Sequence, residues 1–72
     1  MRVTVYLKTP LFAVGHVPGN AWVLEAELIN QGAAGLELAV SGYRDADGRE
    51  LKGDALKLLV PGSKVDHVLL HG

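Results

Sequence analysis

Two histidines near the end of the chain have the residue type and spacing of a metal site. His67 and His71 are four residues apart, Asp66 is adjacent, and His16 lies in the first half of the chain. On a helix, this spacing would place both imidazoles on one face, as zinc sites require. On a strand, which the surrounding pattern favours, they share a face but lie about 13 Å apart, too far for one ion. We therefore expect surface histidines and no metal site, with zinc or nickel binding across a subunit boundary as the alternative.

Acidic residues occur together in two places where carboxylates could act jointly. Glu25 and Glu27 would lie about 7 Å apart on one strand face, a spacing compatible with acid–base catalysis. No neighbour would make one of them an acid and the other a base, so we expect a solvated face. Asp45, Asp47 and Glu50 could bind calcium weakly, but the further ligands of a twelve-residue calcium loop are absent. We interpret this second group as turn residues.

The serines and glycines show no catalytic or nucleotide-binding arrangement. Ser41 and Ser63 are the only serines, and no histidine or acid is placed locally to activate either. Gly32, Gly35 and Gly62 form no motif that would cradle a phosphate. We therefore expect a protein that is not an enzyme and that uses no cofactor.

Tyr6 lies among polar residues in the first segment, where it could stack on a nucleobase. It would share a strand face with Arg2 and Lys8, giving a candidate surface for single-stranded nucleic acid. The seven lysines and arginines are otherwise scattered and the net charge is −1, unlike the clustered positive charge of duplex-binding proteins. We therefore favour packing of Tyr6 on a neighbouring subunit over nucleic-acid binding.

The composition favours an oligomer. Seventy-two residues form at most one domain, and such a domain buries only about 60% of its unfolded surface. Hydrophobic residues make up 49% of the chain and charged residues 21%, and the absence of cysteine excludes disulfides. Apolar surface is therefore expected to be buried between subunits. The candidate interface residues are Leu11, Phe12, Val14 and Trp22.

The sequence pattern predicts a cytoplasmic protein. No apolar run approaches the roughly 18 residues that cross a bilayer, and the first residues have the pattern of a strand and not of a signal peptide. Asn20, Asn30 and Gln31 are the only amide side chains, and the chain has one methionine and no cysteine. This usage is typical of thermophiles.

The first third of the chain is expected to form two strands and a turn. Residues 2–8 alternate strictly between polar and apolar side chains, which predicts a half-buried strand ended by Pro10. Residues 11–17 are nearly all apolar and predict a second strand that is covered on both faces or lies in an interface. Val17-Pro18-Gly19-Asn20 has proline and glycine at the central positions of a type II turn.

Residues 21–29 fit either a strand or a short helix. The preceding asparagine could cap a helix, and Gly32 could end it. Glu25 and Glu27, however, would diverge around a helix but share one face of a strand. We therefore favour the strand, on which Trp22 would be a core residue.

Residues 36–51 predict a β-hairpin. Two alternating segments flank Asp45-Ala46-Asp47-Gly48, in which the first aspartate caps its own backbone and the glycine tolerates positive φ. Beyond this turn the apolar positions change from odd to even, which one extra residue at Gly53-Asp54 would explain as a β-bulge. The alternative is a single helical turn between Asp54 and Pro61.

The last third of the chain completes a small all-β domain. Residues 30–35 are expected to form a loop, residues 60–63 a turn, and residues 65–70 a closing strand. Five or six short strands joined by tight turns predict an all-β fold, or a β-rich one with a short helical turn. The expected architecture is a small antiparallel barrel or roll that spans residues 1–72 as one domain.

The half from Gly35 to Leu70 resembles SH3-like and Sm-like barrels, and short uncharacterised bacterial proteins of the same style. A long bent hairpin is followed by the turn Pro61-Gly62-Ser63-Lys64 and the closing strand Val65-Asp66-His67-Val68-Leu69-Leu70. The Sm-like resemblance implies ring assembly and RNA binding through an Asn-bearing loop and an Arg-Gly loop. Here the loop at residues 45–48 has no asparagine, and that at residues 61–63 has no arginine. We therefore expect an oligomeric scaffold or interaction module, with single-stranded RNA binding as the alternative.

Overall fold

The computed structural model describes residues 1–71, which form an antiparallel sheet and one 3₁₀ turn. The strands are β1 (Arg2–Leu7), β2 (Val23–Gly32), β3 (Gly35–Arg44), β4 (Glu50–Leu51), β5 (Leu56–Val60) and β6 (Val65–His71), and the 3₁₀ turn is η1 (Gly62–Lys64). The prediction of an all-β fold is confirmed. Within these residues, no helix has the length and apolar character needed to cross a membrane.

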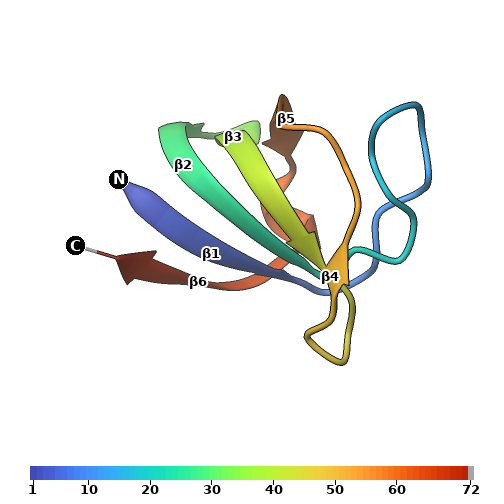
Figure 1. Cartoon of the computed structure of the whole chain (residues 1–72). Helices are drawn as coiled ribbons and strands as arrows, with labels where there is room; N and C mark the ends of the chain where they lie inside the picture. Colours follow the sequence, from blue (N-terminus) through green and yellow to red (C-terminus); the bar gives the residue numbers. More distant parts are fainter. Residues whose placement is uncertain (72) are drawn as a thin grey trace.

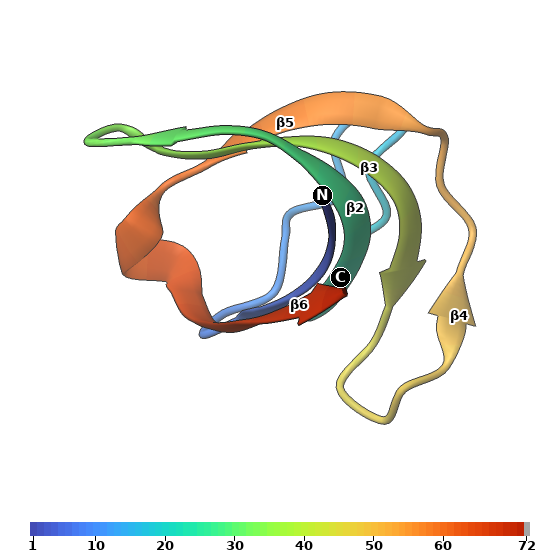
Figure 2. The same cartoon turned by 90° about the vertical axis from the view of Figure 1, so that its left-hand side faces the viewer.

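The sheet curls into a half-barrel (Figures 1 and 2). Its strand order is β4-β3-β2-β1-β6, and β5 pairs with β3 alongside β4. Over the described part of the chain, no strand ladder joins β5 to β6, so the architecture is a roll and not a closed barrel. The first and last strands are neighbours, and residues from the two ends of the sequence therefore meet across β1 and β6.

Alternation along the strands turns one face of the sheet into the core. Val3, Val5 and Leu7 of β1 face inward as predicted, and Leu24 and Ala26 of β2 face the same way. The other buried hydrophobic residues are Ala21, Leu38, Val40, Tyr43 and Val60. Each fully buried valine or leucine stabilises the fold by about 1.5–3 kcal/mol, so this inner face supplies the main driving force. The outer face carries the polar residues and the candidate site.

A bulge in β3 brings residues of opposite parity to the core. Val40 and Tyr43 are both buried, although an uninterrupted strand would point them to opposite faces. The register against β2 shifts between Glu25 and Ala26, which leaves Ser41 as an extra residue in β3. The bulge therefore lets one strand contribute Val40 and Tyr43 to the same core.

A break at residues 52–55 separates β4 from β5. The apolar positions change from odd to even across this break, as expected. On its two sides the chain pairs with different parts of β3: β4 with its end and β5 with its first half. The one-residue bulge predicted at Gly53-Asp54 is wrong, since the interruption is longer. The alternative helical turn between Asp54 and Pro61 is also wrong, because Leu56–Val60 is a strand.

Residues 11–17 form a projecting loop, and the predicted second strand is wrong (Figure 1). The chain reverses at Gly15 and His16, where Val14 and Val17 exchange backbone hydrogen bonds of 3.2 and 2.9 Å. This reversal leaves too few residues on either side to extend a strand along the sheet. The apolar run is therefore a hairpin-like loop outside the sheet.

Backbone hydrogen bonds close the base of this loop. The Leu11 amide donates to Ala21 O at 3.0 Å, and the Asn20 amide donates to Leu11 O at 3.1 Å. The type II turn predicted over residues 17–20 is wrong, because the positive φ, 65°, occurs at Asn20 and not at Gly19. Asparagine is one of the few residues that tolerate this conformation.

The hairpin of β2 and β3 is longer than predicted. The favoured strand over residues 21–29 is confirmed from Val23 onward, and the helical alternative is wrong. Strand pairing continues to Gly32 and Gly35, so the predicted loop over residues 30–35 shrinks to a two-residue turn. The two strands extend beyond the body of the sheet (Figure 2).

Candidate functional site

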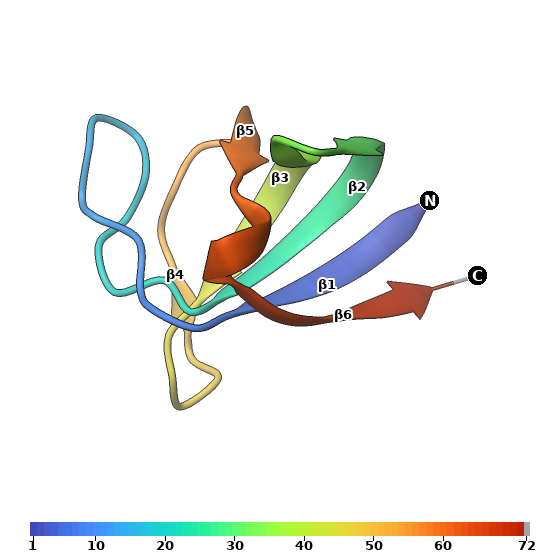
Figure 3. The same cartoon turned by 180° about the vertical axis from the view of Figure 1, so that it is seen from behind.

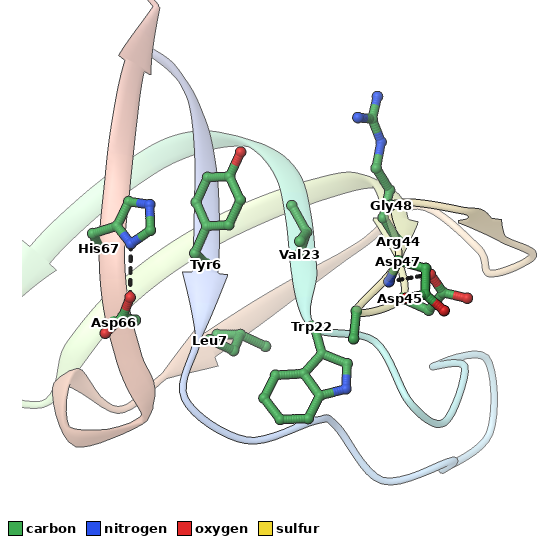
Figure 4. A pocket seen from close by; sticks show the side chains of 11 residues that line it. Tyr6, Leu7, Trp22, Val23, Arg44, Asp45, Asp47, Gly48, Asp66 and His67 are labelled. Atoms are coloured by element: carbon green, nitrogen blue, oxygen red, sulfur yellow. Dashed lines mark hydrogen bonds and ion pairs between the residues drawn. The ribbon is translucent and has the colours of Figure 1, made fainter.

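A groove of about 470 Å³ opens on the outer face of the sheet, beside β1, β6 and the start of β2 (Figure 4). Its main side chains are those of Tyr6, Trp22, Val23, Arg44, Asp66 and His67. The turn at residues 45–48 closes one end. Four separate segments of the chain therefore build the groove, and each is held in place by the strand ladders.

Tyr6 and His67 form a stacked pair on the floor of the groove. They are directly opposite each other in the β1–β6 register, with ring centroids 4.4 Å apart and planes inclined by 8°. His67 Nδ1 lies 2.8 Å from a carboxylate oxygen of Asp66. Because a carboxylate only accepts, Nδ1 carries the proton and donates it, which fixes the imidazole orientation. The pair is a preformed aromatic surface.

Trp22 forms one end of the groove (Figure 4). Its amide donates to Arg44 O at 2.8 Å, which continues the β2–β3 ladder beyond the last paired residues. The prediction of Trp22 as a core residue is wrong: Ala21 is fully buried, and the half-buried indole lines the groove. The single tryptophan of the chain therefore reports on the site directly.

Arg44 is directed along the outer face, away from Trp22 and the adjacent turn (Figure 4). One of its guanidinium nitrogens, Nη2, lies 3.8 Å from Glu25 Oε2. The positive charge of Arg44 is therefore partly balanced by a carboxylate outside the groove.

The turn at residues 45–48 places acidic side chains at the edge of the groove. Asp45 Oδ1 accepts hydrogen bonds from the Asp47 and Arg49 amides, each at 2.9 Å, and Gly48 has a φ of 83°. These features confirm the predicted hairpin turn. With Asp66 on the opposite side, three aspartates line the groove, and they outnumber the one arginine.

A row of hydrogen-bonded polar side chains crosses β2, β1 and β6 next to the groove. The Thr4 hydroxyl donates to the Glu25 carboxylate and lies 2.7 Å from His71 Nε2. Since the hydroxyl proton is directed to Glu25, His71 donates to Thr4 Oγ1 and does not accept from it. Thr4 is only 6% exposed, so its oxygen is not available to a substrate.

The predicted face of Arg2, Tyr6 and Lys8 is only partly assembled. Tyr6 lies in the groove, while Arg2 lies at the other end of β1, opposite Glu27 and His71 in the two ladders. Lys8 follows the last residue of β1. The three residues therefore do not form one continuous basic surface.

Sequence reasoning did not bring Trp22, Arg44 and His67 together in one groove. Trp22 was assigned to the core or to an interface, His67 was considered as a metal ligand, and Arg44 was given no role. His67 was expected at the surface of the last strand. Its position opposite Tyr6, however, depends on the pairing of β1 with β6, two strands at opposite ends of the chain. No local signal identifies that partner.

The three histidines lie in separate environments. His16 pairs with Asp54 at 2.8 Å, His67 with Asp66, and His71 with Thr4. Over residues 1–71, no three histidine or acidic side chains are grouped as metal ligands. A metal site built by one chain from His16, His67 and His71 therefore has no geometric support.

The candidate interface residues differ in exposure. Phe12 and Val14 are 86% and 67% exposed on the projecting loop. Leu11 and Trp22 are half-buried, and Leu11 packs against the core. Of the four candidates, Phe12 and Val14 are thus the two that present a large apolar surface to solvent.

Comparisons with protein families, with curated proteins and with solved structures find no match to this chain. The function is therefore argued from the groove and the surfaces around it.

Proposed function

We propose that this chain is a non-enzymatic protein-interaction module whose groove binds a basic segment of a partner protein. The observation that carries the proposal is a groove with aromatic rings on its floor and at one end, edged by acidic side chains. The rings are those of Tyr6, Trp22 and His67, and the carboxylates are those of Asp45, Asp47 and Asp66.

Aromatic faces and carboxylates attract the same chemical group. A lysine or arginine side chain held over a tyrosine or tryptophan ring gains about 0.5–2 kcal/mol from the cation–π interaction. The nearby carboxylates add attraction at long range and speed the encounter with a basic segment. Within residues 1–71, the Asp47 carboxylate makes no hydrogen bond or ion pair, so it is free to accept from such a ligand.

The one arginine of the groove, Arg44, does not oppose the binding of a basic segment. Its guanidinium extends away from the Trp22 indole and pairs with Glu25 (Figure 4). A positively charged ligand near Trp22 and Asp47 would therefore approach the acidic end of the groove.

The polar row beside the groove supports a binding role over catalysis. A threonine nucleophile needs an exposed oxygen and a base that accepts its proton. Thr4 is buried, and the hydrogen-bond directions make His71 a donor to it. This row is better suited to holding β2, β1 and β6 in register.

Fluorescence of Trp22 tests the proposal. We expect a short lysine- and arginine-rich peptide to change the emission at low salt, while a glutamate-rich peptide of the same length leaves it unchanged. D47N should weaken binding, whereas E37Q, a matched loss of charge on β3 outside the groove, should not. No response to the basic peptide, or equal responses to both peptides, would refute the proposal.

Single-stranded nucleic acid is the second candidate ligand. The parallel Tyr6–His67 pair offers a ring face on which a base could stack, a contact worth about 1–3 kcal/mol. The three aspartates in the groove weigh against phosphate binding. A mixed-sequence oligonucleotide that changes Trp22 emission when the basic peptide does not would favour this candidate, and Y6A should then abolish the effect.

A further inference from the structure

We propose that β6 is a dimerisation strand, which pairs antiparallel with β6 of a second copy of the chain around a two-fold axis at Leu69. The inference concerns the edge of the sheet and is independent of what the groove binds. It begins from the position of β6 at the end of the strand order, where its described neighbour is β1 alone.

The outer edge of β6 is open to a partner strand. Among residues 1–71, no other strand or loop lies beyond it in two opposite views (Figures 1 and 3). An uncovered edge presents unpaired backbone N–H and C=O groups to which another strand can bind. β6 is also long enough to pair, since it runs from Val65 to His71.

Over residues 67–71, β6 lacks the devices that normally protect an edge strand, because the irregularity and the charge at Asp66 lie outside this part. Proline and lysine, the residues that usually block such pairing, are absent from residues 65–71. Leu69 and Leu70 are instead 46% and 64% exposed. The other long free edge, β5, contains Lys57 and is followed immediately by Pro61. β6 is therefore the edge at which a second strand is favoured.

The backbone directions identify which groups of β6 are free. The Leu7 amide donates to Trp22 O, so odd-numbered residues of β1 bond toward β2 and even-numbered ones toward β6. Leu69 lies opposite Thr4, and its backbone groups therefore bond to β1. The alternate residues, Val68 and Leu70, direct their N–H and C=O groups to the open edge.

The side chains select the register. The β1–β6 ladder is irregular at Asp66, which leaves residues 67–71 as the regular part of the strand, with Leu69 at its centre. A two-fold axis at Leu69 places Val68 of each copy opposite Leu70 of the other, so their free backbone groups exchange hydrogen bonds. Opposed residues in this register share a face, as antiparallel pairing requires. An axis at Val68 would instead place Asp66 opposite Leu70, an acid against an aliphatic side chain.

This arrangement covers apolar side chains on both faces of the joined sheet. Val68 lies opposite Val5 of the core, so the inner faces of the two half-barrels become continuous across Val68 and Leu70. On the outer face the two Leu69 side chains meet each other. The second copy thereby covers both exposed leucines of β6, with Leu69 against Leu69 and Leu70 against Val68.

A cysteine substitution tests the axis directly, because the chain has no cysteine of its own. Residues directly opposite in an antiparallel pair have Cβ atoms about 4.5–5.5 Å apart, close enough for a disulfide to form with a small adjustment. Under mild oxidation, L69C should therefore give a covalent dimer. Leu59 lies on β5 with 60% of its surface exposed, so L59C is the matched control. It should remain largely uncrosslinked.

Sedimentation of the unmodified chain is the second measurement. We expect a dimer at micromolar concentration and a folded monomer for L70K, with the strand-type circular dichroism retained. A monomeric unmodified chain would overturn the proposal. Equal crosslinking of L69C and L59C, or crosslinking of L59C alone, would also overturn it, because the contact would then be random or lie at β5.

Discussion

The rings of Tyr6 and His67 lie parallel across β1 and β6, with their centroids 4.4 Å apart. They come from opposite ends of the chain, and the antiparallel register places them directly opposite each other. Asp66 holds the imidazole by a hydrogen bond, so the pair is ordered before any ligand arrives. This relationship joins the fold to the proposed function, because the same contact lies between the paired strands β1 and β6 and forms the floor of the groove.

Loss of one ring should affect both stability and binding. H67A removes the stacking partner of Tyr6, and we expect the free energy of unfolding to fall by about 0.5–1.5 kcal/mol. The basic peptide should also bind more weakly. H67F is the control, since it keeps an aromatic ring but loses the bond to Asp66. Urea unfolding and Trp22 fluorescence measure the two effects, and an unchanged H67A would contradict the assigned role.

The Thr4 hydroxyl should be important for stability. T4V keeps the shape of the side chain but leaves the Glu25 carboxylate and His71 Nε2 without their shared partner. We expect a loss of about 1–3 kcal/mol, the usual result of leaving polar groups unsatisfied. T4S retains the hydroxyl and should lose less. Chemical denaturation gives the comparison, and equal stability of T4V and the parent chain would count against this network.

Stability should decrease at alkaline pH through Tyr43. Burial, followed by the negative charge of Asp54, raises the pKa of the Tyr43 phenol above its ordinary value of 10.0. The folded state therefore holds this proton more tightly than the unfolded state. The resulting stability is fully present below pH 10 and is lost as the pH rises through the folded pKa.

The control for this pH effect is Y43F. It removes the hydrogen bond that the Tyr43 hydroxyl donates to Asp54 O at 2.9 Å, so stability at neutral pH should fall by about 0.5–1.5 kcal/mol. The alkaline decrease should become shallower in Y43F. Urea midpoints measured from neutral to alkaline pH would show this, and parallel curves would contradict it.

Gly35 should not tolerate a side chain. Its φ is 130°, and an added Cβ would collide with the carbonyl oxygen of Val60 on β5. We expect G35A to lower the free energy of unfolding by at least about 2 kcal/mol, from backbone strain and the collision together. G32A, across the same hairpin, meets nothing within 4 Å and should change stability little. Similar melting temperatures for the two variants would argue against this packing of β3 and β5.

Local chemistry was sufficient to predict much of the fold. The alternation of residues 2–8 predicted β1 and its inward face, and the Asp45–Gly48 turn predicted the junction of β3 and β4. The local sequence pattern did not predict the structure of residues 11–17, where an apolar composition suggested a strand and the chain forms a loop. A turn at Gly15 and His16 reverses the chain there, and composition alone does not reveal it. The two-residue turn between β2 and β3 was missed for a similar reason, since alanines carry no turn signal.

The candidate site was less predictable than the fold. The aromatic and polar character of Tyr6 and its strand face could be recognised, because alternation is a property of neighbouring residues. The stacking of Tyr6 on His67, and the outward position of Trp22, depend on which strands pair and in which register. By itself, the sequence determined that this chain would be extended and which side chains would share a face. Only the tertiary structure decided which faces meet, because strand pairing between distant segments is selected by the packing of the whole core.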